Sequence, residues 1–196
     1  MISTRKSHSG LASNVDVPAR YRWLPASEIV DVMGLRPGMS VAELGADEGD
    51  LILQVAEAIG PAGHAFAIES SPEMLARLRE QTQTCRNIHI IEARHHATPI
   101  PTGACDRVIL ANCWAELPDP IAALREAARL LREDGRLILI EWHADAGCPD
   151  APAARTAFHE MVGLLERNTW DIHRHGDVGP YSYFLEAAVC DESVQS

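Results

Sequence analysis

Short apolar segments alternate with longer amphipathic ones along most of this chain, and that alternation constrains its fold more than any other feature. Apolar runs predict β-strands at 40–44, 64–68, 88–91, 106–110 and 136–140. Helical periodicity predicts helices at 26–33, 51–59, 72–84, 120–132 and 152–167. Strands that are apolar throughout and separated by helices form a parallel sheet covered on both faces. We therefore predict an α/β fold, a doubly wound sheet with the 40–44 strand at its centre.

The end of the chain follows a different pattern. Residues 170–189 alternate around Gly176, Gly179 and Pro180, which predicts a terminal hairpin. A chain of 196 residues has the length of one sheet-based domain. We expect 1–17 to be a flexible leader, 18–190 a single domain and 191–196 a flexible tail.

Charge and cysteine content limit the partners and the compartment. The formal net charge is −11 and no basic stripe is visible, so we expect no nucleic-acid partner. No apolar run approaches the ~20 residues that cross a bilayer, so we expect no membrane span. The five cysteines include no C-x-x-C pair, which favours reduced thiols and a cytoplasmic protein. The sequence leaves a homodimer open.

A glycine-containing loop follows the first predicted strand. A dinucleotide fingerprint G-x-G-x-x-G starting at Gly45 requires glycine at 47 and 50, where the chain has Asp47 and Asp50. The pattern acid-x-G-x-G-x-G, typical of methyltransferases, matches at Glu43, Gly45 and Gly49 but not at Asp47. Glycine here lets backbone approach a ligand. By itself, the loop is also compatible with a simple turn from strand to helix.

The end of the second predicted strand strengthens the ligand interpretation. Glu69 ends that strand, and its carboxylate could accept both hydroxyls of a ribose, although a solvated acid at a strand end is the simpler alternative. Ser71 and Pro72 then predict a helix start, with serine as the cap and proline at the first helical position.

Taken in order, these segments resemble the class I S-adenosylmethionine-dependent methyltransferases of the small-molecule type, which include the ubiquinone and menaquinone biosynthesis methyltransferases. The resemblance covers about 22–142. Besides the two loops above, the segments that carry it are 34–38, 99–101, 106–110, 117–131 and 134–141. It implies a Rossmann-like, seven-stranded sheet whose last strand runs antiparallel within the terminal hairpin. It also implies S-adenosylmethionine as cofactor and a small-molecule methyl acceptor.

The resemblance assigns expected roles to residues that follow the strands. The methionine end of the cofactor would be lined by Glu43, Gly45, Ala46 and Gly49. Glu69 would hold the ribose, with Ser70 or Met74 beside the adenine. Asn112 and Cys113 would lie near the transferring methyl group.

Two residues depart from the family pattern. Asp47 replaces the middle glycine and adds a charge that faces the methionine carboxylate, or that could meet the ammonium or sulfonium. Arg94 stands where the family usually has an aspartate facing the adenine amino group. Arginine cannot accept a hydrogen bond, although it could stack on adenine or meet a phosphate. A non-catalytic binding or regulatory protein with degraded or altered cofactor use therefore remains the alternative to an active methyltransferase.

Further candidates lie after the fourth and fifth strands. His143 could act as a general base because its pKa lies near neutrality, and Glu116 could do so if burial raised its pKa. Trp114 and Trp142 could wall an acceptor pocket or simply pack under the loops. His143 with His173 or His175 could hold a metal, but hydrogen-bonded loop histidines are the simpler interpretation, and we predict no metal site.

Overall fold

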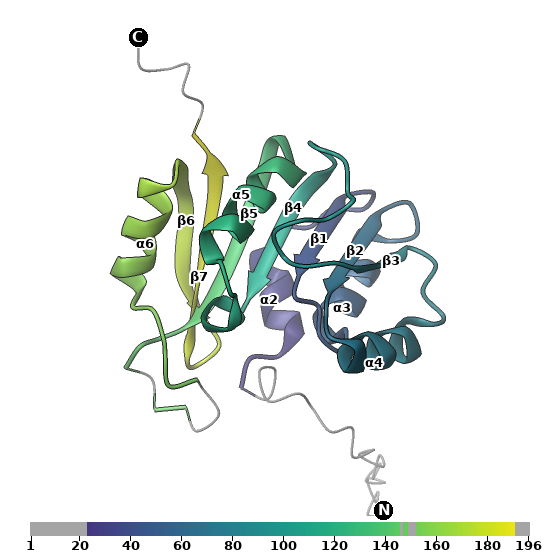
Figure 1. The fold of residues 1–196 in the computed structure, drawn as a ribbon, viewed down its shortest axis with the longest axis horizontal. Coiled ribbons are helices and arrows are strands. Elements are labelled where there is room, and N and C mark those ends of the chain that lie inside the picture. The colour runs from purple at the N-terminus through teal and green to yellow at the C-terminus, as the bar shows by residue number, and fades with distance from the viewer. Residues whose placement is uncertain (1–22, 146, 149–151, 191–196) are drawn as a thin grey trace, which may run out of the picture.

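The computed structural model describes residues 23–145, 147–148 and 152–190, and these form one seven-stranded sheet with helices on both faces (Figure 1). The strands, in chain order, are β1 (Ser40–Leu44), β2 (His64–Glu69), β3 (Ile88–Glu92), β4 (Cys105–Ala111), β5 (Leu131–Trp142), β6 (Trp170–Val178) and β7 (Ser182–Val189). The α-helices are α2 (Ala26–Val32), α3 (Asp50–Ile59), α4 (Pro72–Thr82), α5 (Pro120–Leu130) and α6 (Phe158–Arg167). The expected leader, 1–17, and the expected tail, 191–196, lie outside the described residues. Residues 18–22 of the expected domain lie outside them as well.

The strand order is β3-β2-β1-β4-β5-β7-β6. β1 pairs in parallel with β2 on one side and with β4 on the other. β7 runs antiparallel to both β5 and β6, as the resemblance implied. The sheet and its antiparallel last strand are therefore confirmed. The expected central position of β1 needs one correction, because β4 occupies the middle and β1 lies beside it.

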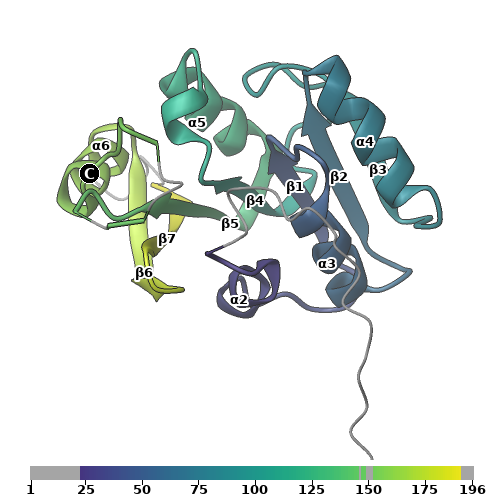
Figure 2. The ribbon, with the colours of Figure 1, turned by 90° about the horizontal axis from the view of Figure 1, so that it is seen from below.

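Each face of the sheet carries its own hydrophobic core. Alternate side chains of a strand point to opposite faces, so Val41 belongs to the core under α2, α3 and α4, whereas Ala42 and Leu44 belong to the core under α5 and α6. Figure 2 shows α2 and α3 on one side of the sheet and α5 on the other. This two-sided covering explains why the interior strands are mostly apolar.

Several predicted boundaries were wrong, and for two of them the structure shows the cause. The helix predicted at 152–167 begins at Phe158, because the preceding segment is held against the sheet: Tyr183 Oη donates to the Thr156 carbonyl at 3.0 Å, and Arg155 donates to the His143 carbonyl at 3.4 Å. The helix predicted at 120–132 ends at Leu130, because the next residue already pairs with Cys105 of β4.

The long connection from β3 to β4 is held against α5 by hydrogen bonds to Glu126 and Arg129, which also form an ion pair with each other. Glu126 is buried and accepts from the Thr98 backbone N–H at 2.8 Å and from the Thr98 hydroxyl at 2.7 Å. Arg129 donates to Glu126 at 2.7 Å and to the Ile100 carbonyl at 2.8 Å. These contacts hold the connection from β3 to β4 against the second half of α5.

Candidate functional site

A pocket of about 370 Å³ opens at the carboxyl ends of the parallel strands, where the chain leaves β1 between β2 and β4. Ligands of open α/β sheets bind at such a reversal of strand order. The pocket is lined by residues from the loops after β1, β2, β3 and β4 and from α4: Gly45, Asp47, Glu69, Ser71, Met74, His95, Cys113, Glu116 and Leu117.

The loop after β1 turns sharply enough to need left-handed backbone. Gly45 and Gly49 have φ angles of 93° and 101°. Asp47 has a φ of 46°, and aspartate is one of the few residues besides glycine that tolerates this region. The backbone N–H groups of Gly45 and Ala46 both donate to the Ile68 carbonyl, at 2.9 and 3.0 Å. The loop therefore keeps the backbone shape of a glycine-rich turn although its middle residue carries a side chain.

The Glu69 carboxylate joins this loop to the loop after β2. Glu69 is buried, and its Oε1 accepts from the backbone N–H groups of Ser70 and Ser71 at 2.7 Å each. Its Oε2 accepts from the Asp47 backbone N–H at 3.0 Å. A carboxylate offers about four lone-pair positions, so one remains for a ligand once these three bonds are made.

His95, rather than Arg94, enters the pocket after β3. Arg94 is exposed and forms an isolated bridge with Ala97. A Cβ atom on Gly45 would lie 3.2 Å from His95 Nε2, so the imidazole covers the first glycine of the loop. His95 was not among the residues for which the sequence predicted a role. Because successive side chains on extended backbone point apart, an outward Arg94 would have indicated an inward His95.

The segment after β4 forms the wall opposite α4. Asn112 is buried with a φ of 51°, and its side-chain amide has no hydrogen-bond partner among the described residues. The Cys113 thiol lies 3.7 Å from the Leu44 carbonyl, to which it donates. The buried Glu141 accepts from the Trp114 backbone N–H at 2.8 Å, and this bond holds the short 3₁₀ helix η1 (Trp114–Glu116) in place.

The remaining candidates lie away from the pocket lining. His143 Nε2 is 3.0 Å from Asp177 Oδ1, and the His143 ring packs 5.4 Å from that of Tyr183. Burial, together with the nearby carboxylates of Glu141 and Glu160, raises the pKa of Tyr183. Trp114 and Trp142 are both buried, and neither lines the pocket.

The alternative metal site is not assembled. His175 packs on Phe158 with 5.2 Å between ring centroids, and His173 lies 3.7 Å from Asp171. Over the described ranges, no three or more histidine, cysteine, aspartate or glutamate side chains gather where they could hold a metal ion. Nor does any helix in those ranges have the length and apolarity to cross a membrane.

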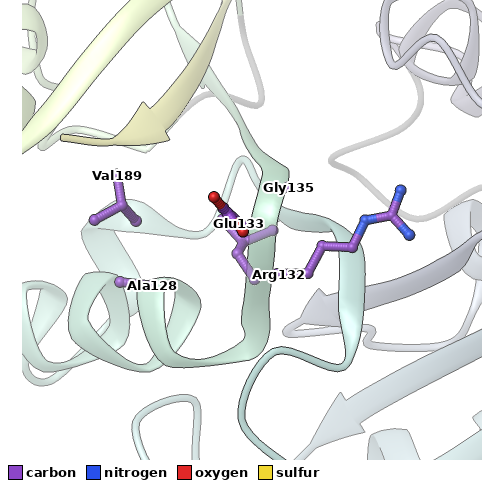
Figure 3. A pocket seen from close by; sticks show the side chains of 6 residues that line it. Ala128, Arg132, Glu133, Gly135 and Val189 are labelled. Carbon is purple, nitrogen blue, oxygen red and sulfur yellow. The ribbon is translucent and has the colours of Figure 1, made fainter. Parts of the chain in front are cut away.

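A second pocket, of about 230 Å³, lies at the other end of β5 (Figure 3). Its lining includes Ala128, Glu133, Gly135 and Val189, and the Arg132 side chain points away from Val189 toward its ion pair with Asp106. None of the residues with a predicted role lies there.

The methyltransferase domain model matches residues 42–139, half of the chain and nearly all of the loops just described. The chain belongs to this family. Relatives of this chain include the ubiquinone/menaquinone biosynthesis C-methyltransferase UbiE of Vibrio cholerae, 28% identical over 74% of this chain and 58% of the relative. The demethylmenaquinone methyltransferase of Lactococcus lactis is 29% identical over 64% of this chain and 49% of that protein. The chain thus spans about half the length of the curated relatives it matches.

Solved structures show the same fold. A SAM-dependent methyltransferase from Aquifex aeolicus superposes with a TM-score of 0.74 at 23% identity, over 88% of this chain and 93% of that one. The class I, Rossmann-like architecture expected for this chain is therefore confirmed.

The pocket brings together part of the predicted site. The predicted residues that line it are Gly45, Asp47, Glu69, Met74, Cys113 and Glu116. Buried within or behind the same loops lie Glu43, Ala46, Gly49 and Asn112. Ser70 is exposed beside them, while Arg94 and His143 lie outside the lining. Ser71, His95 and Leu117 line the pocket and were not predicted as site residues.

Proposed function

We propose that this methyltransferase-family chain transfers a methyl group from S-adenosylmethionine to a small-molecule acceptor. One observation carries the proposal: the pocket at the strand-order reversal combines the left-handed glycine loop with the buried carboxylate of Glu69. A backbone that can approach a ligand closely and an acceptor for a hydroxyl group are the two features that an adenosine ligand needs there.

The residues present fit this cofactor. A pocket of about 370 Å³ lies within the range of roughly 300–1,000 Å³ typical of small-molecule sites. Glu69 would accept a ribose hydroxyl, and Met74 and Leu117 offer apolar surface for the adenine. The buried amide of Asn112 would be satisfied by a polar group of a ligand or by a water molecule. When bound, S-adenosylmethionine supplies an electrophilic methyl group on a sulfonium.

Carboxylates dominate the charged lining of the pocket. Asp47, Glu69 and Glu116 all line it, and no arginine or lysine does so among the described residues. An acidic lining disfavours an anionic acceptor, so the substrate we propose is neutral or cationic and partly apolar. The chain would contribute proximity, alignment of the nucleophile with the methyl group, and exclusion of water.

Glu116 is the best-placed candidate to take a proton from the acceptor. It lines the pocket on η1, beside Cys113, but it is exposed, so the burial on which its predicted role depended is not observed. His143, by contrast, points to Asp177 outside the lining. We therefore assign the proton-accepting role to Glu116, propose that Cys113 faces the transferring methyl group, and give His143 no direct contact with the substrate. A cytoplasmic location, the absence of a nucleic-acid partner and an optional homodimer stay predictions.

The decisive experiment is calorimetric titration of the full chain with S-adenosylmethionine and S-adenosylhomocysteine, followed by transfer assays with labelled cofactor. The names of the relatives make demethylmenaquinone analogues the first acceptors to test. We expect saturable binding of both ligands and label transfer to at least one neutral or cationic aromatic acceptor. Glu116→Gln should lower kcat at least tenfold, whereas the matched control His143→Asn should not. Absence of binding at millimolar ligand would overturn the proposal; binding without any transfer would favour the non-catalytic alternative.

A further inference from the structure

Two histidines on neighbouring strands form a close pair far from the pocket. His64 is the first residue of β2, and His89 is the second residue of β3. His64 Nδ1 lies 3.0 Å from His89 Nε2, and both residues are exposed. We propose that this pair is a binding site for a divalent transition-metal ion such as Ni²⁺, Zn²⁺ or Cu²⁺.

Backbone hydrogen bonds fix the relative positions of the two histidines on their strands. The residue paired with His89 across the ladder is Phe66, and His64 lies two residues earlier on the same face of β2. The His64 backbone N–H donates to the Met39 carbonyl at 3.0 Å, and the next N–H donates to the Asn87 carbonyl at 2.8 Å. Both strand starts are therefore held in register before any ion binds.

Phe66 restricts the orientation of both imidazoles. Its ring lies 5.3 Å from the His89 ring and 6.3 Å from the His64 ring, with interplanar angles of 31° and 20°. The two imidazole centroids are 5.2 Å apart. Because both rings already face each other beside an aromatic wall, little side-chain entropy remains to be lost on binding an ion.

The spacing matches two ligands of one ion. Nitrogens that each lie about 2.05 Å from a metal are about 2.9 Å apart at a right angle and about 3.3 Å apart at the tetrahedral angle. The observed 3.0 Å falls between these values. The present contact is a hydrogen bond in which one of the two facing nitrogens carries its ring's proton. Binding requires that ring to adopt its other tautomer, with the proton on the nitrogen that faces away from the ion, and a small rotation of each ring then directs both lone pairs to the metal.

Imidazole ligands select the class of ion. They suit Zn²⁺, Cu²⁺ and Ni²⁺, whereas Mg²⁺ and Ca²⁺ prefer oxygen. No third side chain joins the pair within the described ranges, so water completes the coordination and the ion exchanges with solvent. The net charge of −11 raises the local concentration of cations.

The site is separate from the pocket and does not depend on the proposed function. His64 begins β2, and Glu69 ends it at the pocket. Five residues of extended strand, at about 3.3 Å each, place about 16 Å between them. Loss of the metal should therefore leave S-adenosylhomocysteine binding unchanged.

The test is calorimetric titration of the full chain with Ni²⁺ in a non-chelating buffer at neutral pH. We expect one ion per chain, and at least tenfold weaker binding in each of His64→Gln and His89→Gln. The double variant should bind Ni²⁺ only slightly more weakly than either single variant, because one imidazole alone forms no chelate. His173→Gln, at an exposed histidine without a histidine partner, is the matched control and should bind as the wild type does.

A second readout guards against an indirect effect on folding. Electron paramagnetic resonance of the Cu²⁺ complex should show coupling to two nitrogens in the wild type and to one in either single variant. Thermal melts establish that the variants are folded. No Ni²⁺ binding in the wild type, or binding that the double variant retains at full strength, would overturn the proposal.

Discussion

The carboxylate of Glu69 accepts a 3.0 Å hydrogen bond from the backbone N–H of Asp47, so the acid that ends β2 holds the loop that follows β1. Glu69 thereby shapes the pocket, and under the proposed function it would also contact the ligand. Its two tasks can be separated because each has its own measurable quantity, stability for the first and affinity for the second.

Glu69→Gln should weaken S-adenosylhomocysteine binding at least tenfold and also lower the melting temperature. The amide loses the charge that strengthens its hydrogen bonds, and a charge-assisted bond contributes about 1.5–3 kcal/mol. Calorimetry and thermal melts measure the two effects. Glu92→Gln is the matched control, because Glu92 is the ladder partner of Glu69 on β3 but is exposed. Equal affinity in the two folded variants would exclude the ligand role of Glu69.

Asp47→Gly should bind S-adenosylhomocysteine about tenfold more tightly, a gain of about 1.4 kcal/mol. Glycine adopts the φ of 46° without strain, and the change removes a negative side chain from the lining. Arg94→Asp should have little effect, since Arg94 lies outside the lining. Asp47→Asn separates charge from shape, because asparagine also tolerates left-handed backbone. Weaker binding in Asp47→Gly would mean that the aspartate contacts the ligand favourably.

Gly49→Ala should destabilise the fold more than Gly38→Ala. Both glycines have positive φ, so both variants carry a conformational penalty of about 1–2 kcal/mol. Only at Gly49 would the new Cβ meet a neighbour, with Leu78 Cδ1 at 2.6 Å; nothing lies within 4 Å at Gly38. Denaturant unfolding of both variants provides the comparison. If the two free energies of unfolding agreed, Leu78 would have to move aside freely.

Glu126 should make the fold sensitive to acid. Burial alone raises its pKa, but hydrogen bonds from Arg129 and Thr98 outweigh burial and lower it to about 2 from an ordinary 4.5. A depressed carboxyl pKa stabilises the folded state above pH 4.5, and the stabilisation is lost as the pH falls from about 4.5 to about 2. The loss amounts to about 3 kcal/mol at most.

Unfolding free energies of the wild type and Glu126→Gln across that pH range measure this effect. The variant should be less stable at neutral pH and should show a flatter dependence on acid. The exposed Glu133→Gln is the control and should follow the wild type. Parallel curves for the wild type and Glu126→Gln would refute the assignment.

The strands could be predicted from the sequence because burial on both faces makes them mostly apolar, and each predicted strand overlaps an observed one. The start of α6 could not be predicted from the sequence. Contacts between residues far apart in sequence, such as the hydrogen bond from Tyr183 to Thr156, hold the residues before the helix against the sheet. Glu69 was identifiable by its place at a strand end. The inward position of His95 could not be predicted, because strand spacing alone does not say which of two adjacent side chains turns toward the pocket.

The outermost strands of the sheet also bear on how two copies of the chain could associate. β6 is an edge strand, and it is interrupted by a bulge between Ile172 and Arg174. Its exposed residues are Asp171, His173, Arg174, His175 and Asp177. Charges and bulges on an edge discourage the pairing of one sheet with another. Association by joining two sheets along β6 into one continuous ladder is therefore disfavoured, and the same features protect the folded chain from edge-to-edge aggregation.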